Sequence, residues 1–235
     1  MKKAIILSNG VFPHRSEALN ALLQIPLLIC CDGACNKLVA SSLFAHASVK
    51  PEVHVIGDGD SMNDEIRKNP PFPITFVDGY DDQETNDLTK AVKYALSLDV
   101  THLIILGATG LREDHTLGNI SLLGQYVSMK TVSGRVLNVR IYSDYGFFTP
   151  LTETTTLPSF PRQQVSLFSL TPDTVLSTDG LKYPILRRQL HWWWEATLNE
   201  AIGTSFTVTI ENKSESSCDT AQRNVVIVYQ THEAK

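Results

Sequence analysis

The first 143 residues alternate between short apolar segments of strand length and longer segments whose apolar residues recur at helical spacing. We expect strands at 3–8, 26–31, 53–57, 74–77, 102–106 and 136–142, and helices at 16–23, 35–44, 86–98 and 114–129. The apolar face of the helix over 86–98 comprises Leu88, Ala91, Val92, Ala95 and Leu96, which leaves Asp87 in its first turn. Such alternation predicts an α/β fold with a doubly wound, mainly parallel sheet.

The pattern changes near residue 145. From there the chain has short, β-branched segments separated by Pro, Gly, Asp or Asn, with no long helical pattern between them. We expect strands within 152–158, 164–170, 174–185, 205–212 and 224–230. These features predict a small antiparallel β-sandwich. We therefore place two domains at 1–144 and 145–235.

Polar loops rich in glycine and acidic residues follow several of the expected strands in the first domain. They are CDGACN (31–36), GDGDSM (57–62), DDQETNDLTKAV (81–92) and GATGLREDHTLGN (107–119). Open α/β sheets bind their ligands at the carboxyl ends of the strands. We therefore expect the four loops to converge on one shared site.

The last of these loops has the composition of a polyphosphate site. Gly107 and Gly110 allow backbone amides to approach an anion closely, and Arg112 offers a fork of donors matched to phosphate oxygens. Asp114 lies beside an expected helix N-terminus, where it is either a cap or a chemical group. On these residues alone, phosphate binding and an ordinary Asp-capped helix both stay open.

Acidic residues in the two middle loops have a spacing that suits a hard cation. Asp58 and Asp60 are one residue apart, so a single turn can direct both carboxylates at the same ion, and Asp87 can supply a third. Mg²⁺ is commonly held by one or two carboxylates together with substrate phosphates and waters. The alternative is that all three are solvated loop or capping acids. The loops around them favour Mg²⁺.

In the same order, CDGACNKL, GDGDSM, DQETNDLTKA and GATGLREDHTLGN resemble the four motifs of the thiamine pyrophosphokinase family, and GLKYPI (180–185) resembles a fifth. The resemblance covers most of the chain and is thin after residue 188. It implies Mg²⁺-dependent transfer of a pyrophosphoryl group from ATP to the primary alcohol of thiamine, which gives thiamine diphosphate and AMP. It also implies a homodimer in which thiamine lies between the loops of one subunit and the β-sandwich of the other.

The resemblance also implies roles for matching residues. Mg²⁺ would be held by Asp58, Asp60 and Asp87. The catalytic residues would be Arg112, on the phosphates, and Asp114, near the attacking hydroxyl. Besides Arg112, the nucleotide would contact Asp32, Gly33, Asp82, Thr109 and His115. Thiamine would contact Gln83, Thr197 and Asn199.

Several positions depart from the pattern of the family. The family frequently has glycine at the positions of Ala34 and Leu111. It frequently has an aromatic residue at the position of Gly59 and threonine at that of Asn86. The thiamine-contacting stretch corresponds to ATLN (196–199), in which Ala196 and Leu198 stand at hydroxyl positions. The phosphate site therefore resembles the family more closely than the thiamine pocket does.

Composition and charge narrow the class of protein. The chain has 235 residues, 43% of them hydrophobic and 19% charged, which is typical of a globular protein of one large or two modest domains. A net charge of −5 argues against a nucleic-acid binder, which would need a basic face. No apolar stretch approaches the roughly 18 residues of a membrane-spanning helix, and the N-terminal apolar run is too short for a signal peptide. We therefore expect a cytoplasmic protein that binds neither nucleic acid nor membrane.

Two residue clusters need an interpretation of their own. Cys30, Cys31 and Cys35 have no matching His/Cys group elsewhere, so buried thiols are favoured over metal or redox chemistry, whereas Cys218 falls in a polar, loop-like stretch. The second cluster is the tryptophan triplet at 192–194. In a strand, successive side chains point to opposite faces, so at least one tryptophan would be exposed unless a partner or ligand covers it. The triplet therefore belongs either to the core or a dimer interface, or to a surface that contacts a flat aromatic substrate.

Two other functions fit parts of the sequence. VHVIGDGDSM also resembles the strand and acidic pair of haloacid-dehalogenase-like phosphatases, in which Asp58 would be the nucleophile and Asp60 the acid/base. The downstream lysine and acidic pair of such enzymes are not identifiable here. A non-catalytic nucleotide or thiamine sensor would use the same loops for binding only, but acids suited to Mg²⁺ favour an enzyme.

Overall fold

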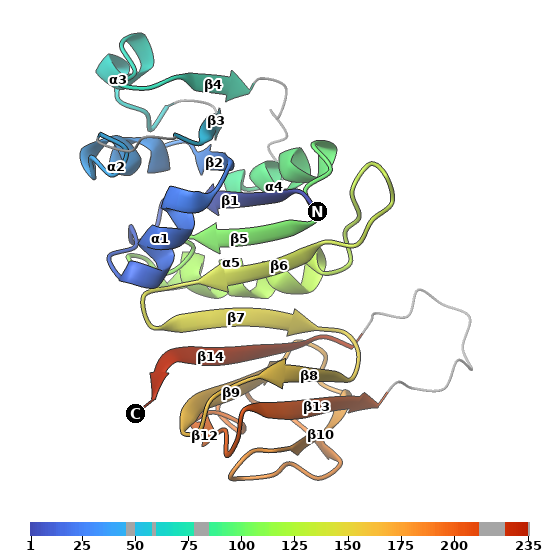
Figure 1. The fold of residues 1–235 in the computed structure, drawn as a ribbon. Coiled ribbons are helices and arrows are strands. Elements are labelled where there is room, and N and C mark those ends of the chain that lie inside the picture. Colours follow the sequence, from blue (N-terminus) through green and yellow to red (C-terminus); the bar gives the residue numbers. More distant parts are fainter. Residues whose placement is uncertain (46–49, 58–59, 78–84, 212–223, 235) are drawn as a thin grey trace. The chain divides into compact units, whose positions relative to one another are not determined.

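The computed structural model describes residues 1–45, 50–57, 60–77, 85–211 and 224–234. The chain divides into two compact units, one of residues 1–122 and 128–144 and the other of residues 123–127 and 145–235 (Figure 1). The helices are α1 (Ser16–Gln24), α2 (Ala34–Ala40), α3 (Asp64–Lys68), α4 (Asp87–Ser97) and α5 (Glu113–Tyr126). Among the described residues, no helix is long and apolar enough to span a bilayer.

The first unit is built on a parallel sheet. Its strands lie in the order β6-β5-β1-β2-β3-β4, and every neighbouring pair among them is parallel. Their bounds are β1 (Lys3–Leu7), β2 (Leu27–Cys31), β3 (Glu52–Ile56), β4 (Ile74–Val77), β5 (His102–Leu106) and β6 (Asn138–Tyr142). The central strands β1 and β2 are apolar and almost wholly buried, as expected of a parallel sheet with both faces covered.

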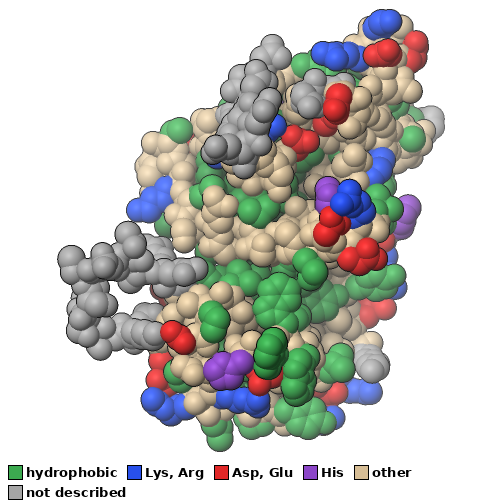
Figure 2. Space-filling view, turned by 180° about the vertical axis from the view of Figure 1, so that it is seen from behind, with side chains coloured by type: hydrophobic (Ala, Val, Ile, Leu, Met, Phe, Trp, Pro, Cys, Tyr) green, Lys and Arg blue, Asp and Glu red, His purple; other side chains and the backbone are tan. Residues whose placement is uncertain are grey.

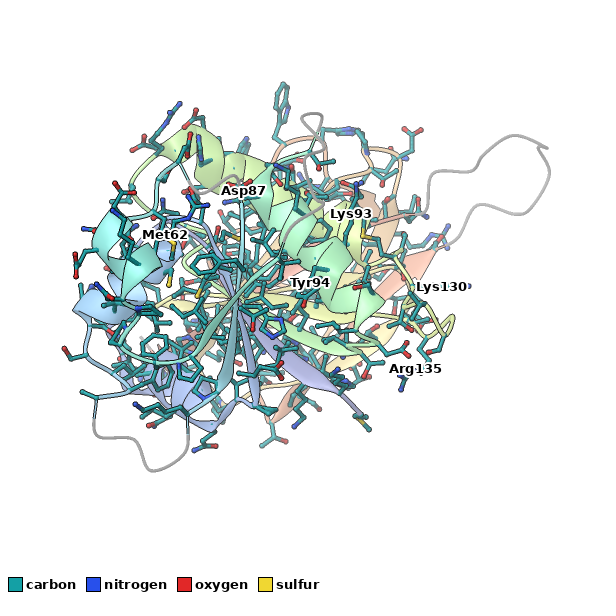
Figure 3. All side chains as sticks on the ribbon, turned by 90° about the horizontal axis from the view of Figure 1, so that it is seen from above. Met62, Asp87, Lys93, Tyr94, Lys130 and Arg135 are labelled. Atoms are coloured by element: carbon teal, nitrogen blue, oxygen red, sulfur yellow. The ribbon has the colours of Figure 1, made fainter. Side chains whose placement is uncertain are left out.

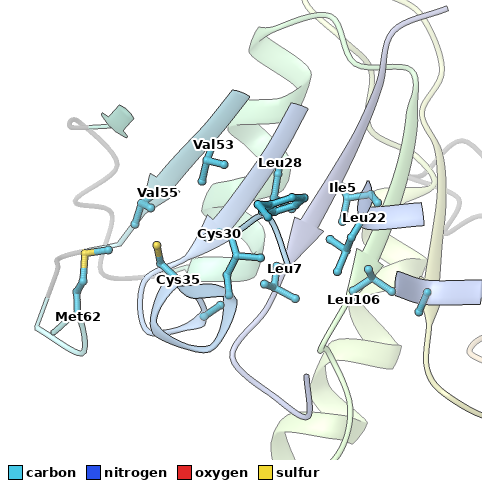
Figure 4. Close-up of a cluster of buried hydrophobic side chains, with 14 residues drawn as sticks. Ile5, Leu7, Leu22, Leu28, Cys30, Cys35, Val53, Val55, Met62 and Leu106 are labelled. Carbon is cyan, nitrogen blue, oxygen red and sulfur yellow. The ribbon is translucent and has the colours of Figure 1, made fainter. Parts of the chain in front are cut away.

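Helices cover the two faces of this sheet. Ala18 and Leu22 of α1 and Leu38 of α2 pack on one face against Leu7 and Cys30, in the cluster drawn in Figure 4. The apolar face of α4 is buried on the opposite side, where the helix contacts β1, β2 and β3. The predicted doubly wound α/β sheet is therefore confirmed, as is the buried face of α4.

The strand order creates a switch point between β1 and β5. From β1 the chain proceeds through β2 and β3 towards one edge of the sheet, whereas from β5 it proceeds to β6 at the other edge. The connections that leave β1 and β5 therefore diverge to opposite sides. In open α/β sheets, ligands bind in the crevice that this divergence leaves outside the carboxyl ends of the strands.

The second unit is antiparallel and consists of two layers of strands. One layer has the order β12-β9-β14-β7 and the other β11-β10-β13-β8. The bounds are β7 (Gly146–Leu151), β8 (Thr155–Pro158), β9 (Gln163–Ser169), β10 (Val175–Asp179), β11 (Arg188–Gln189), β12 (Asn199–Glu200), β13 (Ser205–Glu211) and β14 (Val226–Ala234). Alternate residues of β9 and β13 point into a shared apolar core, so the predicted antiparallel sandwich is confirmed.

Several elements differ from the expectations, among them the two-residue strands β11 and β12, which the sequence pattern does not predict. Strand β7 begins at Gly146, within the stretch expected to be a domain boundary, and α3 is a short helix that the apolar pattern does not signal. The Asn63 side chain caps α3 by accepting a hydrogen bond from the Glu65 amide at 2.8 Å. The tryptophan triplet forms a turn and not a strand, with Trp192, Trp193 and Trp194 respectively 67%, 38% and 71% exposed.

Candidate functional site

A cavity of about 350 Å³ opens at the carboxyl ends of the parallel strands, at the switch point between β1 and β5. Every described residue that lines it belongs to the first unit. The polar and glycine residues of its wall are Ser8, Asn9, Gly10, Asp32, Gly33, Ser61, Asn86, Asp87, Gly110, Arg112, His115 and Asn119. Residues from four of the loops that follow parallel strands, together with the start of α4, thus share one cavity.

Backbone hydrogen bonds fix the loop after β1 against the loop after β5. The Ser8 amide donates to the Leu106 carbonyl at 2.8 Å, and the Gly10 amide donates to the Gly107 carbonyl at 2.7 Å. A Cβ atom at Gly10 would lie only 2.3 Å from the Gly107 oxygen, so this position requires glycine. Gly107 and Gly110 have φ values of +66° and +78°, the left-handed region that glycine enters without strain. These constraints hold the wall of the cavity close to the strand ends.

Asp32 and Gly33 form the turn between β2 and α2. Asp32 is only 4% exposed, and its Oδ2 accepts a hydrogen bond from the Ser61 amide at 2.9 Å, which ties this turn to the loop after β3. A Cβ atom at Gly33 would lie 2.7 Å from the Asn9 side-chain nitrogen. Both predicted nucleotide-binding residues therefore lie on the cavity wall, where the backbone approaches its neighbours closely.

Asp87 lines the cavity at the N-terminal end of α4, with Tyr94 further along the same helix (Figure 3). The Asn86 side chain caps the helix by accepting from the Thr89 amide at 2.8 Å, and Lys90 lies 3.4 Å from the Asp87 carboxylate. Burial raises the pKa of the Cys31 thiol far above its ordinary value, and the negative charges of Asp87 and Asp32 raise it further. Two carboxylates thus act on one buried thiol beside the cavity.

The predicted metal trio is described only in part. Asp58 lies outside the described residues. Asp60 is exposed and accepts a hydrogen bond from the Ser61 hydroxyl at 3.0 Å, one residue from the cavity wall. In the described part of the chain, no three His, Cys, Asp or Glu side chains gather closely enough to hold a metal ion. The hard carboxylate oxygens of Asp32 and Asp87 on one cavity fit Mg²⁺ bound together with phosphates, because that ion takes few ligands from the protein.

The turn before α5 presents Arg112 to the cavity, and the first turn of α5 presents His115. The Arg112 guanidinium donates two hydrogen bonds to the Asp114 carboxylate, from Nε at 3.1 Å and from Nη2 at 2.6 Å. This pairing lowers the pKa of Asp114 and raises that of Arg112. Asp114 lies in the first turn of α5 and is not among the residues that line the cavity.

Thr109 contributes through its backbone. Its carbonyl accepts from the Val11 amide at 3.0 Å, and its side chain is not part of the cavity wall. Leu111, at a frequent glycine position of the family, has φ +67°. A side chain in this left-handed conformation is strained, so the tight turn is retained here without the residue that suits it best.

The predicted thiamine contacts Thr197 and Asn199 lie in the second unit. The Thr197 hydroxyl donates to the Trp194 carbonyl at 2.8 Å. The buried Asn199 amide donates to the Tyr183 carbonyl at 2.7 Å and accepts from the Tyr183 amide at 3.1 Å. Both side chains therefore hold loops of this unit in place. Asp82 and Gln83 lie outside the described residues.

The tryptophan turn is organised by one carboxylate. Glu195 accepts hydrogen bonds from the amides of His191 at 2.6 Å and Trp192 at 2.9 Å, and from Arg188 at 3.0 Å. Figure 2 shows hydrophobic side chains gathered on the surface of this unit. Four large hydrophobic side chains here are about two-thirds exposed or more: Leu186 at 78%, Trp192 at 67%, Trp194 at 71% and Leu198 at 73%. The triplet is therefore not part of the core of the second unit.

Sequence reasoning missed part of the cavity wall. Ser8, Asn9 and Gly10 line it, yet the sequence indicates only an ordinary loop there. Asn119 also lines it, and its side chain donates to the Ala108 carbonyl at 2.8 Å. The signal that identifies the first three residues is the position of β1 at the switch point, which becomes visible only with the strand order.

The chain matches two family models. Residues 19–133 match the catalytic domain of thiamin pyrophosphokinase, and residues 146–214 match the substrate-binding domain of the same family. Thiamine pyrophosphokinase 1 of rice, Oryza sativa subsp. japonica, is 30% identical over 122 residues. That match covers 45% of this chain and 46% of the rice protein, less than half the length of this relative.

Solved structures share the fold at low sequence identity. Thiamine pyrophosphokinase from Bacillus subtilis superposes with a TM-score of 0.71 at 19% identity, covering 98% of this chain and 99% of that one. Thiamin pyrophosphokinase from Candida albicans gives a TM-score of 0.76 at 15% identity, covering 98% of this chain and 89% of that one. At such identities these two structures establish the fold alone. The two domain models, in the expected order and together covering most of the chain, show that the chain belongs to the thiamine pyrophosphokinase family.

Proposed function

We propose that this protein transfers a pyrophosphoryl group from ATP to the primary alcohol of thiamine, giving thiamine diphosphate and AMP. The observation that carries the proposal is the cavity at the switch point, which joins glycine turns, Arg112 and His115 to two carboxylates in one space. Glycine turns and a guanidinium suit phosphate oxygens, and carboxylates suit the cation that accompanies them. Membership of the family supplies the identity of the acceptor alcohol.

Magnesium is part of the proposal. We assign its protein ligands to Asp58, Asp60 and Asp87, with Asp32 close to the phosphates. When bound, Mg²⁺ would neutralise charge on the triphosphate during the transfer. Lys90 lies 3.4 Å from the Asp87 carboxylate and would hold it at the cavity wall.

Arg112 and Asp114 would divide the chemistry between them. A phosphate group competes well for a guanidinium, because both present matched pairs of donors and acceptors. Binding of ATP to Arg112 would therefore free the Asp114 carboxylate, whose pKa the pairing now lowers. A freed Asp114 would accept the proton of the thiamine hydroxyl, or orient it, while the hydroxyl attacks the β-phosphorus.

The thiamine side of the site rests on the resemblance to the family. We assign it to Gln83 and to the segment that contains Thr197 and Asn199, contributed within a homodimer with a shared active site. The contacts of Thr197 and Asn199 with neighbouring backbone favour a role in shaping that segment. A cytoplasmic location, and the absence of nucleic-acid and membrane partners, stay predictions from the sequence.

One incubation tests the proposed function. The purified protein is mixed with ATP, Mg²⁺ and thiamine, and the products are separated by chromatography. Equal amounts of AMP and thiamine diphosphate would support the proposal. Release of inorganic phosphate from a generic phosphate ester, without AMP, would instead indicate a phosphatase. Tight binding of ATP or thiamine without turnover would indicate a sensor.

A further inference from the structure

Lys37 is a partly buried lysine on α2 whose ammonium contacts the β1 loop, residues 8–12 that follow strand β1. Its Nζ donates to the carbonyl oxygens of Asn9 and Gly10, both at 2.6 Å. Burial lowers the pKa of this lysine, since removing an ammonium from water disfavours its charge. The two short contacts with oxygen atoms offset that cost. A charged side chain is therefore directed inward at two adjacent peptide groups.

These peptide groups belong to the wall of the cavity. Asn9 and Gly10 line it, whereas Lys37 is not among the lining residues. The same loop is paired with the loop after β5 through the Gly10 amide, at 2.7 Å from the Gly107 carbonyl, and the Val11 amide, at 3.0 Å from the Thr109 carbonyl. Lys37 thus acts on the loop from one side, and the β5 loop fixes it from the other.

The neighbouring residue links α2 to a third loop. The Asn36 side chain donates to the Ser61 carbonyl at 2.8 Å and accepts from the Asn63 amide at 3.0 Å. Asn36 and Lys37 therefore tie the helix that follows Asp32 and Gly33 to the loops after β3 and β1. Because the β1 loop is paired with the β5 loop, the placement of these cavity walls depends on two consecutive side chains.

We propose that Lys37 is a positioning residue of the nucleotide site. By binding the Asn9 and Gly10 carbonyl oxygens, this α2 side chain keeps them directed away from a bound polyphosphate. The inference rests on the proposed function, since it takes the cavity to be the nucleotide site. Carbonyl oxygens carry partial negative charge, so two of them turned towards a triphosphate would repel it. The lysine removes that repulsion without contacting the ligand.

The experiment compares Lys37→Met, Lys37→Arg and, as a control for lost charge, Lys130→Met, which alters an exposed lysine outside the cavity wall. Calorimetric titration with ATP and Mg²⁺, without thiamine, measures affinity. Hydrogen–deuterium exchange of residues 8–12 measures how often the hydrogen-bonded amides of this loop open, independently of ligand binding. We expect Lys37→Met to weaken ATP binding at least about tenfold and to speed exchange in this loop by a similar factor. Lys37→Arg keeps the charge and the donors in a larger group, so it should lose less affinity than Lys37→Met, and Lys130→Met should stay within about twofold of wild type.

The outcomes separate this inference from the proposed function. A wild-type protein that does not bind ATP would overturn the proposed function. The exchange data would then show only whether Lys37 holds the β1 loop in place. Unchanged affinity and exchange in a folded Lys37→Met variant would overturn the inference. If Lys37→Met does not fold, Lys37→Gln decides: it removes the positive charge from the two carbonyl oxygens, so unchanged affinity and exchange in that folded variant would overturn the inference.

Discussion

Arg112 and Asp114 form a two-point ion pair beside the cavity, with Nε 3.1 Å from Oδ1 and Nη2 2.6 Å from Oδ2. The two side chains are 70% and 61% exposed, so solvent screens the pair and its opening costs little. The side-chain hydrogen bond is the main reason why the pKa of Asp114 is lowered. A carboxylate held in this way is a weaker base than a free one. The pair therefore holds together the guanidinium that we propose binds phosphate and the carboxylate that we propose accepts the proton.

The first prediction concerns that restraint. Substitution Arg112→Ala removes the hydrogen bonds and the positive charge, so the pKa of Asp114 should rise towards its ordinary value. NMR titration of the Asp114 carboxyl carbon in wild type and variant measures the change. A pKa that is the same in both proteins would show that the ion pair is not formed in solution.

The second prediction concerns the use of Asp114. In Asp114→Asn the side chain keeps its shape but accepts no proton, so kcat should fall by about 10²–10⁴, the contribution expected of a general base. The KM for ATP should change much less, since Asp114 is not on the cavity wall. Steady-state kinetics measure both constants. Glu113→Gln, at the preceding exposed position, is the control and should leave kcat within about twofold of wild type, because the proposed transfer assigns this residue no role. Near wild-type turnover in Asp114→Asn would remove this residue from the mechanism.

The third prediction tests the proposed metal ligands. Asp87→Asn and Asp60→Asn should each raise the Mg²⁺ concentration needed for half-maximal activity at least about tenfold, because each removes one negative ligand. Asp64→Asn is a matched control, since Asp64 lies in the first turn of α3 as Asp87 lies in the first turn of α4, but is not on the cavity wall. Loss of an acid from a first helical turn costs about 0.3–1 kcal/mol, so the stability of the Asp64 and Asp87 variants should fall alike. An equal Mg²⁺ requirement in all variants would argue against the assignment.

The fourth prediction compares two glycines, Gly10 in a crowded place and Gly118 in an open one. A Cβ atom at Gly10 would lie 2.3 Å from the Gly107 oxygen and 2.6 Å from the Thr109 oxygen. Gly10→Ala should therefore destabilise the protein by about 1–3 kcal/mol, the usual cost of overpacking. Gly118, inside α5, has no other atom of the described residues within 4 Å of its added Cβ, apart from the adjacent backbone of its own helix. Gly118→Ala should stabilise the protein by about 0.5–1 kcal/mol, because alanine suits a helix interior better.

Urea unfolding of the two alanine variants gives both free energies. The comparison is sharp because the chemical change is identical and only the surroundings differ. A Gly10→Ala variant as stable as wild type would show that the β1 and β5 loops can separate without cost. Their pairing would then not define the wall of the cavity.

Much of the fold follows from local patterns in the sequence. Buried strands such as β1 and β2 are continuous apolar segments, and the apolar spacing of α4 fixes which face is buried. The acidic and glycine-bearing loops could be placed at one edge because parallel strands end on the same side of a sheet. Asp32, Asp87, Arg112 and His115 do line one cavity.

Other features depend on information that local patterns lack. The β1 loop becomes part of the site only because β1 is adjacent to β5, and strand order is a property of the whole sheet. The restraint of Asp114 by Arg112 is a matter of side-chain direction, which spacing alone does not determine. Strand β7 was missed because its sequence, GFFTPL, contains glycine and proline, which usually mark turns.

The last prediction concerns acid stability and Asp99, far from the proposed chemistry. Asp99 follows α4 with φ +61°, and its Oδ1 accepts from the Ser133 hydroxyl at 2.6 Å and the Ser133 amide at 3.2 Å. The hydrogen bond from the Ser133 side chain is the main cause that lowers the pKa of Asp99 to about 2. A pKa lowered in the folded state means that the charged form stabilises folding. That contribution is present above the unfolded pKa of about 3.9 and is lost as the pH falls towards 2.

Asp99→Asn removes the charge and keeps a residue that tolerates left-handed backbone. Thermal melts from pH 7 to pH 2 should show a lower Tm for the variant at pH 7 and a gap that narrows below about pH 4. Ser133→Ala should reproduce this pH dependence, because it removes the main hydrogen bond to the carboxylate while leaving Asp99 in place. A gap of constant size across the whole range would mean that Asp99 acts through its backbone conformation and not through its charge.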